Sequence, residues 1–180
     1  MSPFNFQARK EFVQRNSAHE CGHMTVLFKS DRLSKLNYFP YKVAADGREG
    51  IIESSTVTEL IKEDCVALAA SMIGELISLG HCDPERLLDD RQQVQRLANQ
   101  PLENFALKAY EVIKENLLFF RLLNIEVEKK MMVFFDQIGD GDPTALREEM
   151  TIVTLAQVEE VYKRAESILA GFPGKTEIQK

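Results

Sequence analysis

Two histidines flank a glutamate near the start of the chain, in the order His19-Glu20-Cys21-Gly22-His23. If this segment is helical, both imidazoles lie on one face, because residues four apart are neighbours along a helix. Their ring nitrogens can then bind one zinc ion, and Glu20 lies close enough to hold a water molecule on that ion. Zinc lowers the pKa of a bound water towards ~7, and the carboxylate can take its proton. The spacing is therefore typical of metal-assisted hydrolysis.

The same pattern can also arise by chance on a solvated surface helix, and two observations favour a metal site. The chain contains only three histidines, and two of them belong to this pattern. The helical face that carries His19 and His23 also carries Phe12 and Val26, so it is mostly a core-facing surface on which histidines need partners. The third histidine, His81, is interpreted as a surface residue in a loop.

A catalytic zinc site needs a third protein ligand, and the sequence favours a carboxylate. The pattern predicts a helix over 84–99, with Asp83 as its N-cap. Asp90 lies on the apolar face of that helix, together with Leu87 and Val94. A buried carboxylate is unfavourable unless it is paired or binds a metal. We therefore expect Asp90 to be the third ligand; a buried salt bridge or a cap to a neighbouring helix is the alternative.

Glu75 is the interior charge of another helix, which we predict over 57–80. From Cys65 onward this helix is apolar almost all round, so it should be central and buried. A buried glutamate near zinc can ligate the ion, or it can accept the second N–H of a ligating imidazole and fix its tautomer. We favour the second role for Glu75. A structural carboxylate held by backbone donors is the alternative.

Taken in order, these segments resemble the peptidase domain of the FtsH-type zinc metalloproteases. Ser17–His23 is similar to the zinc-binding helix of that family, and Ile73–Gly80 is similar to its Gly-rich Ala-Glu-Glu-Leu segment. Leu88-Asp89-Asp90 takes the place of the family's Ser-Asn-Asp, whose aspartate completes the zinc site. The resemblance thus also implies that Asp90 is a ligand. It covers most of the chain, although His-Glu-x-x-His is its one specific motif.

The chain also departs from that family. FtsH-type proteases carry an ATP-driven unfoldase and membrane-spanning helices ahead of the peptidase domain, whereas we expect a single stand-alone domain over 1–180. Near the site, Met24 replaces the small residue usual after the second histidine, and Ser71–Glu75 is a reduced form of the family's Gly-Arg-Ala-Ala-Glu-Glu pattern.

The resemblance implies a zinc peptidase, with Glu20 as general base, that cuts flexible or unfolded polypeptides. A separate unfoldase and a second copy of the chain are its candidate partners. The alternative is a catalytically retired peptidase that acts as an interaction or regulatory module. The hypothesis of a purely structural zinc domain is weaker, because Glu20 would then have no role.

The expected fold is mainly α (α+β) and zincin-like, with a small β-sheet or hairpin after the zinc helix. The predicted helices lie near 7–30, 57–80, 84–99, 103–135 and 151–170. Asp46-Gly47 is the turn signal of the β element, and Pro40 restricts its strand to a sheet edge. Zinc peptidases commonly hold substrate as an added strand on such an edge, although a protected edge is the alternative. The substrate-binding candidates on this strand are Tyr38, Phe39, Tyr41 and Val43.

Length and composition restrict the class of protein. A chain of 180 residues with 44% hydrophobic residues can form one domain with a real core. The net charge of −6 argues against nucleic acid or an anionic membrane as partner. No stretch approaches the ~18 apolar residues of a membrane span, and three cysteines suit a reducing compartment, so we expect a soluble cytoplasmic protein. The apolar runs Leu117–Phe120 and Met131–Phe135 either contact another subunit or belong to a buried core helix.

Overall fold

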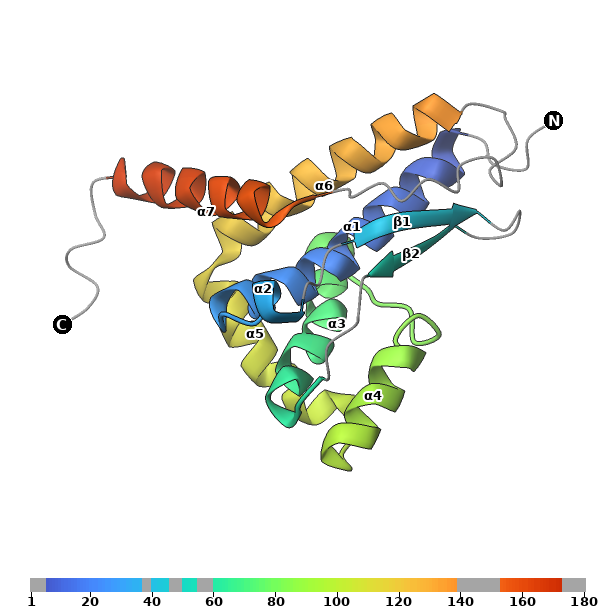
Figure 1. The fold of residues 1–180 in the computed structure, drawn as a ribbon, viewed down its shortest axis with the longest axis vertical. Coiled ribbons are helices and arrows are strands. Elements are labelled where there is room, and N and C mark those ends of the chain that lie inside the picture. Colours follow the sequence, from blue (N-terminus) through green and yellow to red (C-terminus); the bar gives the residue numbers. More distant parts are fainter. Residues whose placement is uncertain (1–5, 37–39, 46–49, 55–59, 139–152, 173–180) are drawn as a thin grey trace.

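The structure is a computed structural model that describes residues 6–36, 40–45, 50–54, 60–138 and 153–172 (Figure 1). The prediction of a mainly α fold is confirmed. The elements in chain order are α1 (Phe6–Lys29), α2 (Leu33–Leu36), β1 (Pro40–Ala45), β2 (Gly50–Ser54), the 3-10 helix η1 (Lys62–Asp64), α3 (Cys65–Leu79), α4 (Leu88–Ala98), the 3-10 helix η2 (Leu102–Phe105), α5 (Ala106–Glu115), α6 (Leu117–Ile138) and α7 (Leu155–Ala170). The two strands pair in antiparallel fashion, with Val43 opposite Ile52.

The centre of the molecule is the contact between α1 and α3, where the two backbones touch. A Cβ atom added to Gly22 would lie 2.1 Å from the carbonyl oxygen of Ala70, and one added to Gly74 would lie 2.3 Å from that of Ala18. Neither position has room for a side chain, so the two glycines permit a separation that no other residue would allow. This close approach brings the His-Glu-x-x-His face of α1 directly against α3.

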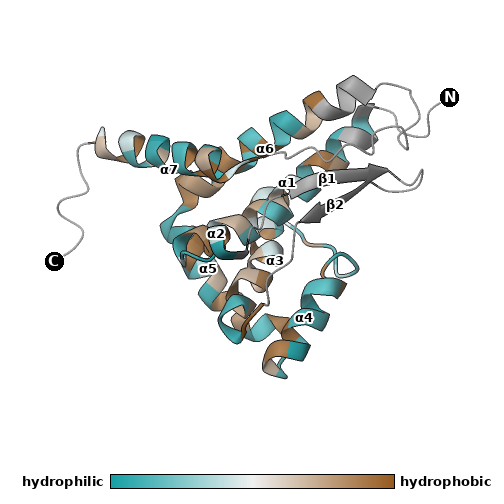
Figure 2. Ribbon diagram, viewed as in Figure 1, coloured by the Kyte–Doolittle hydropathy of each residue, from teal (hydrophilic) through white to brown (hydrophobic). Residues whose placement is uncertain are grey.

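The helix α3 is buried because its sequence is apolar on every side. All residues from Ala67 to Glu75 are buried, and the helix ends at Gly80, which adopts φ 78° and donates its N–H to Leu76 O at 3.0 Å. Such a left-handed C-terminal residue is the usual place for glycine. In Figure 2, by contrast, α4 and α7 alternate between hydrophilic and hydrophobic residues, as expected of helices that bury one face.

The boundaries of several predicted helices were wrong, and the reason is local in each case. At the start of α3, the Asp64 carboxylate accepts the N–H of Ile61 at 2.8 Å and closes a 3-10 turn, so the helix begins at Cys65 instead of residue 57. Arg32 binds the same carboxylate through two hydrogen bonds, of 2.9 and 2.7 Å, and thereby fixes the turn to the end of α1.

Asp83 does not cap the helix that we predicted from residue 84. Its side chain accepts the N–H of Glu85 at 3.0 Å and its carbonyl accepts that of Arg86 at 3.2 Å, so residues 84–87 form turns and α4 begins at Leu88. The predicted helix over 103–135 is divided into η2, α5 and α6. It breaks at Asn116, whose side chain donates to Val112 O at 2.8 Å and competes with the backbone of the helix.

The long helix α6 packs along α1, and α7 packs on α6 (Figure 1). An aromatic group of Phe28, Phe119 and Tyr162 joins the three helices, with ring centroids 5.1 to 5.3 Å apart. In the apolar runs of α6, Phe119 and Met131 are buried in this core, whereas Leu117 and Val133 are exposed. Among the described residues, no helix combines the length and apolar character needed to cross a membrane.

Candidate metal centre

His19 and His23 lie one turn apart on α1, on the face that meets α3. Their Nε2 atoms are 3.3 Å apart, and the rings meet edge to face with centroids 4.9 Å apart. His23 is 2% exposed, so its imidazole must find partners within the protein. The spacing of the motif therefore brings the two rings together as the sequence predicted.

The second nitrogen of each ring has a defined partner on α3. His23 Nδ1 lies 2.8 Å from Ala67 O, and His19 Nδ1 lies 2.8 Å from Glu75 Oε1. A carbonyl and a carboxylate can only accept, so both Nδ1 atoms carry the proton. In the neutral rings each Nε2 then offers a lone pair, which is the tautomer that a metal ligand needs. The Glu75 carboxylate thus accepts from His19, and its role beside a bound metal stays a prediction.

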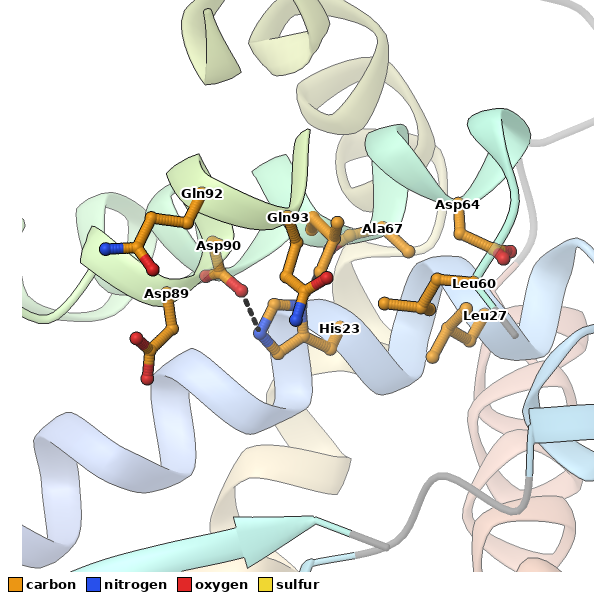
Figure 3. Close-up of a pocket in the computed structure, with 10 residues that line it drawn as sticks. His23, Leu27, Leu60, Asp64, Ala67, Asp89, Asp90, Gln92 and Gln93 are labelled. Atoms are coloured by element: carbon orange, nitrogen blue, oxygen red, sulfur yellow. Dashed lines mark hydrogen bonds and ion pairs between the residues drawn. The ribbon is translucent and has the colours of Figure 1, made fainter. Parts of the chain in front are cut away.

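The carboxylate of Asp90 completes the group from α4. Its Oδ2 lies 3.5 Å from His19 Nε2, and its Oδ1 lies 3.6 Å from His23 Nε2. Among the described residues, one ligand atom from each of these three side chains lies within 4.8 Å of the others. Asp90 is directed at His23 in Figure 3, whereas the neighbouring Asp89 is exposed. The helical phase of α4 therefore presents the aspartate that both sequence arguments selected.

The chemistry of this donor set fits a divalent metal. Two imidazole lone pairs and a carboxylate converge on one point, and such acceptors repel one another unless a cation lies between them. Burial by itself lowers the pKa of His19, but the hydrogen bond to Glu75 and the charges of Asp90, Glu20 and Glu75 outweigh it, so this pKa is raised from 6.5. The surroundings thus favour positive charge, whether a proton or a metal ion. Two histidines and one carboxylate are a known ligand set for catalytic zinc.

Ser71 supports Asp90, a role that the sequence did not predict. Its Oγ donates to Asp90 Oδ2 at 2.5 Å, within the buried face of α3. Ser71 and Glu75 are four residues apart in an otherwise apolar helix, so they lie on the same side of it. That pairing was a signal in the sequence that both residues face the same group, in which Glu75 contacts His19 and Ser71 contacts Asp90.

Glu20 directly follows His19 in the chain and is buried, with 7% of its surface exposed. The charge of Glu20 helps to raise the pKa of His19. Burial raises the pKa of the Cys21 thiol, and the charge of Glu20 raises it further. Cys21 is completely buried, as expected for a small core residue, and it is not part of the metal-binding group.

The segment between α3 and α4 is hydrogen-bonded to α3 and to α1. Glu75 uses its second oxygen to accept the N–H of Asp83 at 3.1 Å, and Arg86 donates to the side chain of Asn16 on α1. Asp83 also lies 3.8 Å from Arg15. These contacts set the position from which α4 begins, and therefore the position of Asp90.

A pocket of about 250 Å³ opens beside His23 and Asp90 (Figure 3). Leu27, Leu60, Ala67 and Leu68 supply its apolar lining. Asp89 lies at the opposite end of the pocket from Leu27 and Leu60.

The remaining predicted residues lie elsewhere. His81 is exposed in the loop after α3, as interpreted from the sequence, with Nδ1 3.2 Å from Leu79 O. Tyr38 and Phe39 lie outside the described residues. Tyr41 and Val43 belong to β1, of which the structure describes the backbone only. The proposed substrate strand therefore stays a prediction.

Comparisons of the chain with protein family models, with curated proteins and with solved structures gave no match. What the protein does must therefore be inferred from its side chains.

Proposed function

We propose that this protein is a zinc metallopeptidase of the FtsH-like, zincin type that hydrolyses peptide bonds in flexible or unfolded polypeptides. The observation that supports this most directly is the convergence of His19, His23 and Asp90, with Glu20 in the helix between the two histidines. The tautomers favoured by Ala67 O and Glu75 suit metal ligation, and a fortuitous pair of surface histidines would have no need of them.

Each residue of the group has a separate task in this proposal. His19, His23 and Asp90 hold the metal. Zinc, when bound, supplies a positive charge that polarises the scissile carbonyl and makes water acidic near neutral pH. Glu20 takes a proton from the attacking water and passes it to the leaving amine. Glu75 and Ala67 keep both imidazoles in the ligating tautomer, and Ser71 orients the carboxylate of Asp90.

The substrate in this proposal is a flexible or unfolded polypeptide of the cytoplasm. It binds as an added strand on the edge of β1. A separate unfoldase or a second copy of the protein are the partners that would present such chains to it. No observation on the described residues favours a retired peptidase. Absence of cleavage in the test below would support that alternative.

The test compares the wild type with Glu20→Gln at equal zinc content, with casein as an unstructured substrate. Glutamine has the shape of glutamate but cannot accept the proton, so the variant should keep its fold and its zinc and lose cleavage by several orders of magnitude. A chelator should abolish wild-type cleavage, and added zinc should restore it.

Two results would contradict the proposal. If the fully zinc-loaded wild type cuts no flexible substrate, the interaction-module alternative replaces the peptidase. If both proteins cut equally, the activity comes from a contaminant or from another base.

A further inference from the structure

Arg86 lies beside the metal-binding group, on the side of His19. Its guanidinium donates to the side chain of Asn16, which is 3% exposed on α1. Asn16 precedes His19 by three residues, so the two are neighbours on one helical face, separated by a rise of ~4.5 Å. Arg86 therefore reaches the margin of the site before His19, whereas the pocket lined by His23 and Leu27 lies further along α1.

The positive charge of Arg86 has a neutral partner. Among the described residues, Asn16 is the only side chain that accepts from its guanidinium, and no carboxylate lies within ion-pair distance of it. The charge of Glu75 acts on Arg86, but its two oxygens are used by His19 and by the N–H of Asp83. Several N–H donors of the guanidinium are therefore left for another acceptor.

The charge of Arg86 is also only partly compensated. Arg86 is half-buried, and burial is the main reason why the pKa of its guanidinium is lowered from the usual value. The neighbouring charges do not reverse this shift; they are Glu75, Glu20 and Asp83, which favour the cation, and Arg15, which opposes it. A partly desolvated cation of this kind is stabilised by an added anion. A carboxylate fits best, because it accepts two parallel N–H bonds from a guanidinium.

We propose that Arg86 binds the C-terminal carboxylate of the substrate, so that the peptidase removes the last residues of a flexible polypeptide. The inference rests on the proposed function, which places the scissile bond at His19, His23 and Asp90. One residue of an extended chain spans ~3.5 Å, so a carboxylate held by Arg86 leaves room for about one or two residues beyond that bond. Water adds across the bond, which leaves a new carboxylate on the shortened chain and a free amine on the released fragment. Chain ends are also the parts of folded proteins that are most often flexible.

The test compares two peptides of Ala and Ser, labelled with fluorescein at the N-terminus, that end in a free carboxylate or in an amide. Binding is measured by fluorescence anisotropy on the zinc-loaded Glu20→Gln protein, so that cleavage does not interfere. The free acid should bind at least about tenfold more tightly, because hydrogen bonds to a charged group contribute this factor or more. Equal affinities would overturn the inference without any change at Arg86.

Variants in the same Glu20→Gln background then test which group holds the carboxylate. Arg86→Gln should reduce the preference for the free acid to less than about twofold, and Arg86→Lys should restore part of it, because an ammonium keeps the charge but not the paired donors. Arg96→Gln is the matched control and should keep the full preference. Arg96 is exposed on α4, and within the part of the chain that the structure describes it has no ion-pair partner.

Zinc content and Tm are measured for each of these variants. A full preference that survives Arg86→Gln would mean that the carboxylate binds the metal itself, and would overturn the role of Arg86. If Arg86→Gln loses its fold, Arg86→Lys decides, since a preference as large as that of the parent protein would have the same meaning.

Cleavage separates this inference from the proposed function. The wild type should shorten the free-acid peptide from its C-terminal end, as followed by mass spectrometry, and the amide should have a KM at least about tenfold higher. If the free acid binds as predicted but neither peptide is cut, the carboxylate site stands and the peptidase fails. If both peptides are cut equally and at internal bonds, the peptidase stands and the role of Arg86 is wrong.

Discussion

Asp89 and Asp90 are consecutive residues with different surroundings. Asp90 is 7% exposed and accepts from Ser71 at 2.5 Å, while its oxygens face both imidazoles; Asp89 is exposed at the rim of the pocket. A carboxylate is kept buried at this place only if a cation or hydrogen-bond donors compensate for its lost hydration. The pair therefore offers a matched test of the metal site.

Asp90→Asn should weaken zinc binding by more than about 100-fold, because loss of a ligand exceeds the ~10–100-fold effect of losing an outer partner. Asp89→Asn removes the same charge one residue away and should change the affinity by less than about threefold. Competition with a chromophoric chelator measures both constants. A larger loss in Asp89→Asn than in Asp90→Asn would assign the wrong face of α4 to the metal.

The thiol of Cys82 provides a prediction on pH. Burial, and after it the charge of Glu75, raises the pKa of this half-buried thiol above 9.0, although Arg91 acts in the opposite direction. Only the thiolate reacts with iodoacetamide, so a raised pKa means less thiolate and slower reaction at pH 7 to 8 than for an unfolded cysteine. The alkylation rate of Cys82, followed by mass spectrometry, should therefore keep rising beyond pH 9. A rate that levels off below pH 8 contradicts the assigned surroundings.

At the residue scale, the sequence predicted those side chains whose position follows from helical phase alone. His19, His23 and Asp90 each lie on a face defined within a single helix. Asn16, Arg86 and the carbonyl of Ala67 were missed, because their roles depend on how one helix is placed against another. That placement is not encoded in the periodicity of either helix.

Among the elements, α1 and α3 are joined by the two glycines that let their backbones touch. Gly22 lies within the His-Glu-x-x-His motif, so the same short segment provides both the close packing of α1 and two of the candidate ligands. The Ala67 carbonyl and Glu75 can reach the imidazoles only at this separation. The helix contact and the metal group should consequently be lost together.

Gly22→Ala should destabilise the protein by about 1–3 kcal/mol or more, because the new methyl group would have to push Ala70 O away from 2.1 Å. The higher helix propensity of alanine, at most ~1 kcal/mol, is too small to compensate. Urea unfolding followed by circular dichroism measures the change. Gly171→Ala is the control, since its nearest neighbour would be 3.4 Å away, and it should be nearly neutral. Equal stability of Gly22→Ala and wild type would exclude the close contact.

Helix type was easier to predict than helix boundary. The predicted start and end of α1 lie within one residue of those observed. Asp83 looked like a helix cap but closes a turn, and Asn116 interrupts an apolar pattern that seemed continuous. Asp and Asn side chains bond their own backbone in turns as readily as at helix ends, so their position alone does not fix the boundary.

On the scale of the whole molecule, the candidate ligands come from α1 and α4, and the residues that hydrogen-bond to them come from α3, which is largely buried. Asp90 is more than sixty residues from His23 along the chain, and the two meet only in the folded state. The unfolded chain therefore cannot offer the same set of ligands. A metal that binds this group must stabilise the fold as well.

Zinc at about 100 times its dissociation constant should stabilise the native protein by ~2.7 kcal/mol, because a ligand that binds only the folded state shifts the unfolding equilibrium by mass action. For a chain of this size that corresponds to a rise in Tm of roughly 5–10 °C. Differential scanning fluorimetry with increasing zinc measures the shift, and a chelator should reverse it. The double variant His19→Ala/His23→Ala lacks both imidazoles, so added zinc should not raise its Tm. An equal rise in that variant would mean that zinc binds elsewhere on the protein, and the assignment of His19, His23 and Asp90 as its ligands would have to be given up.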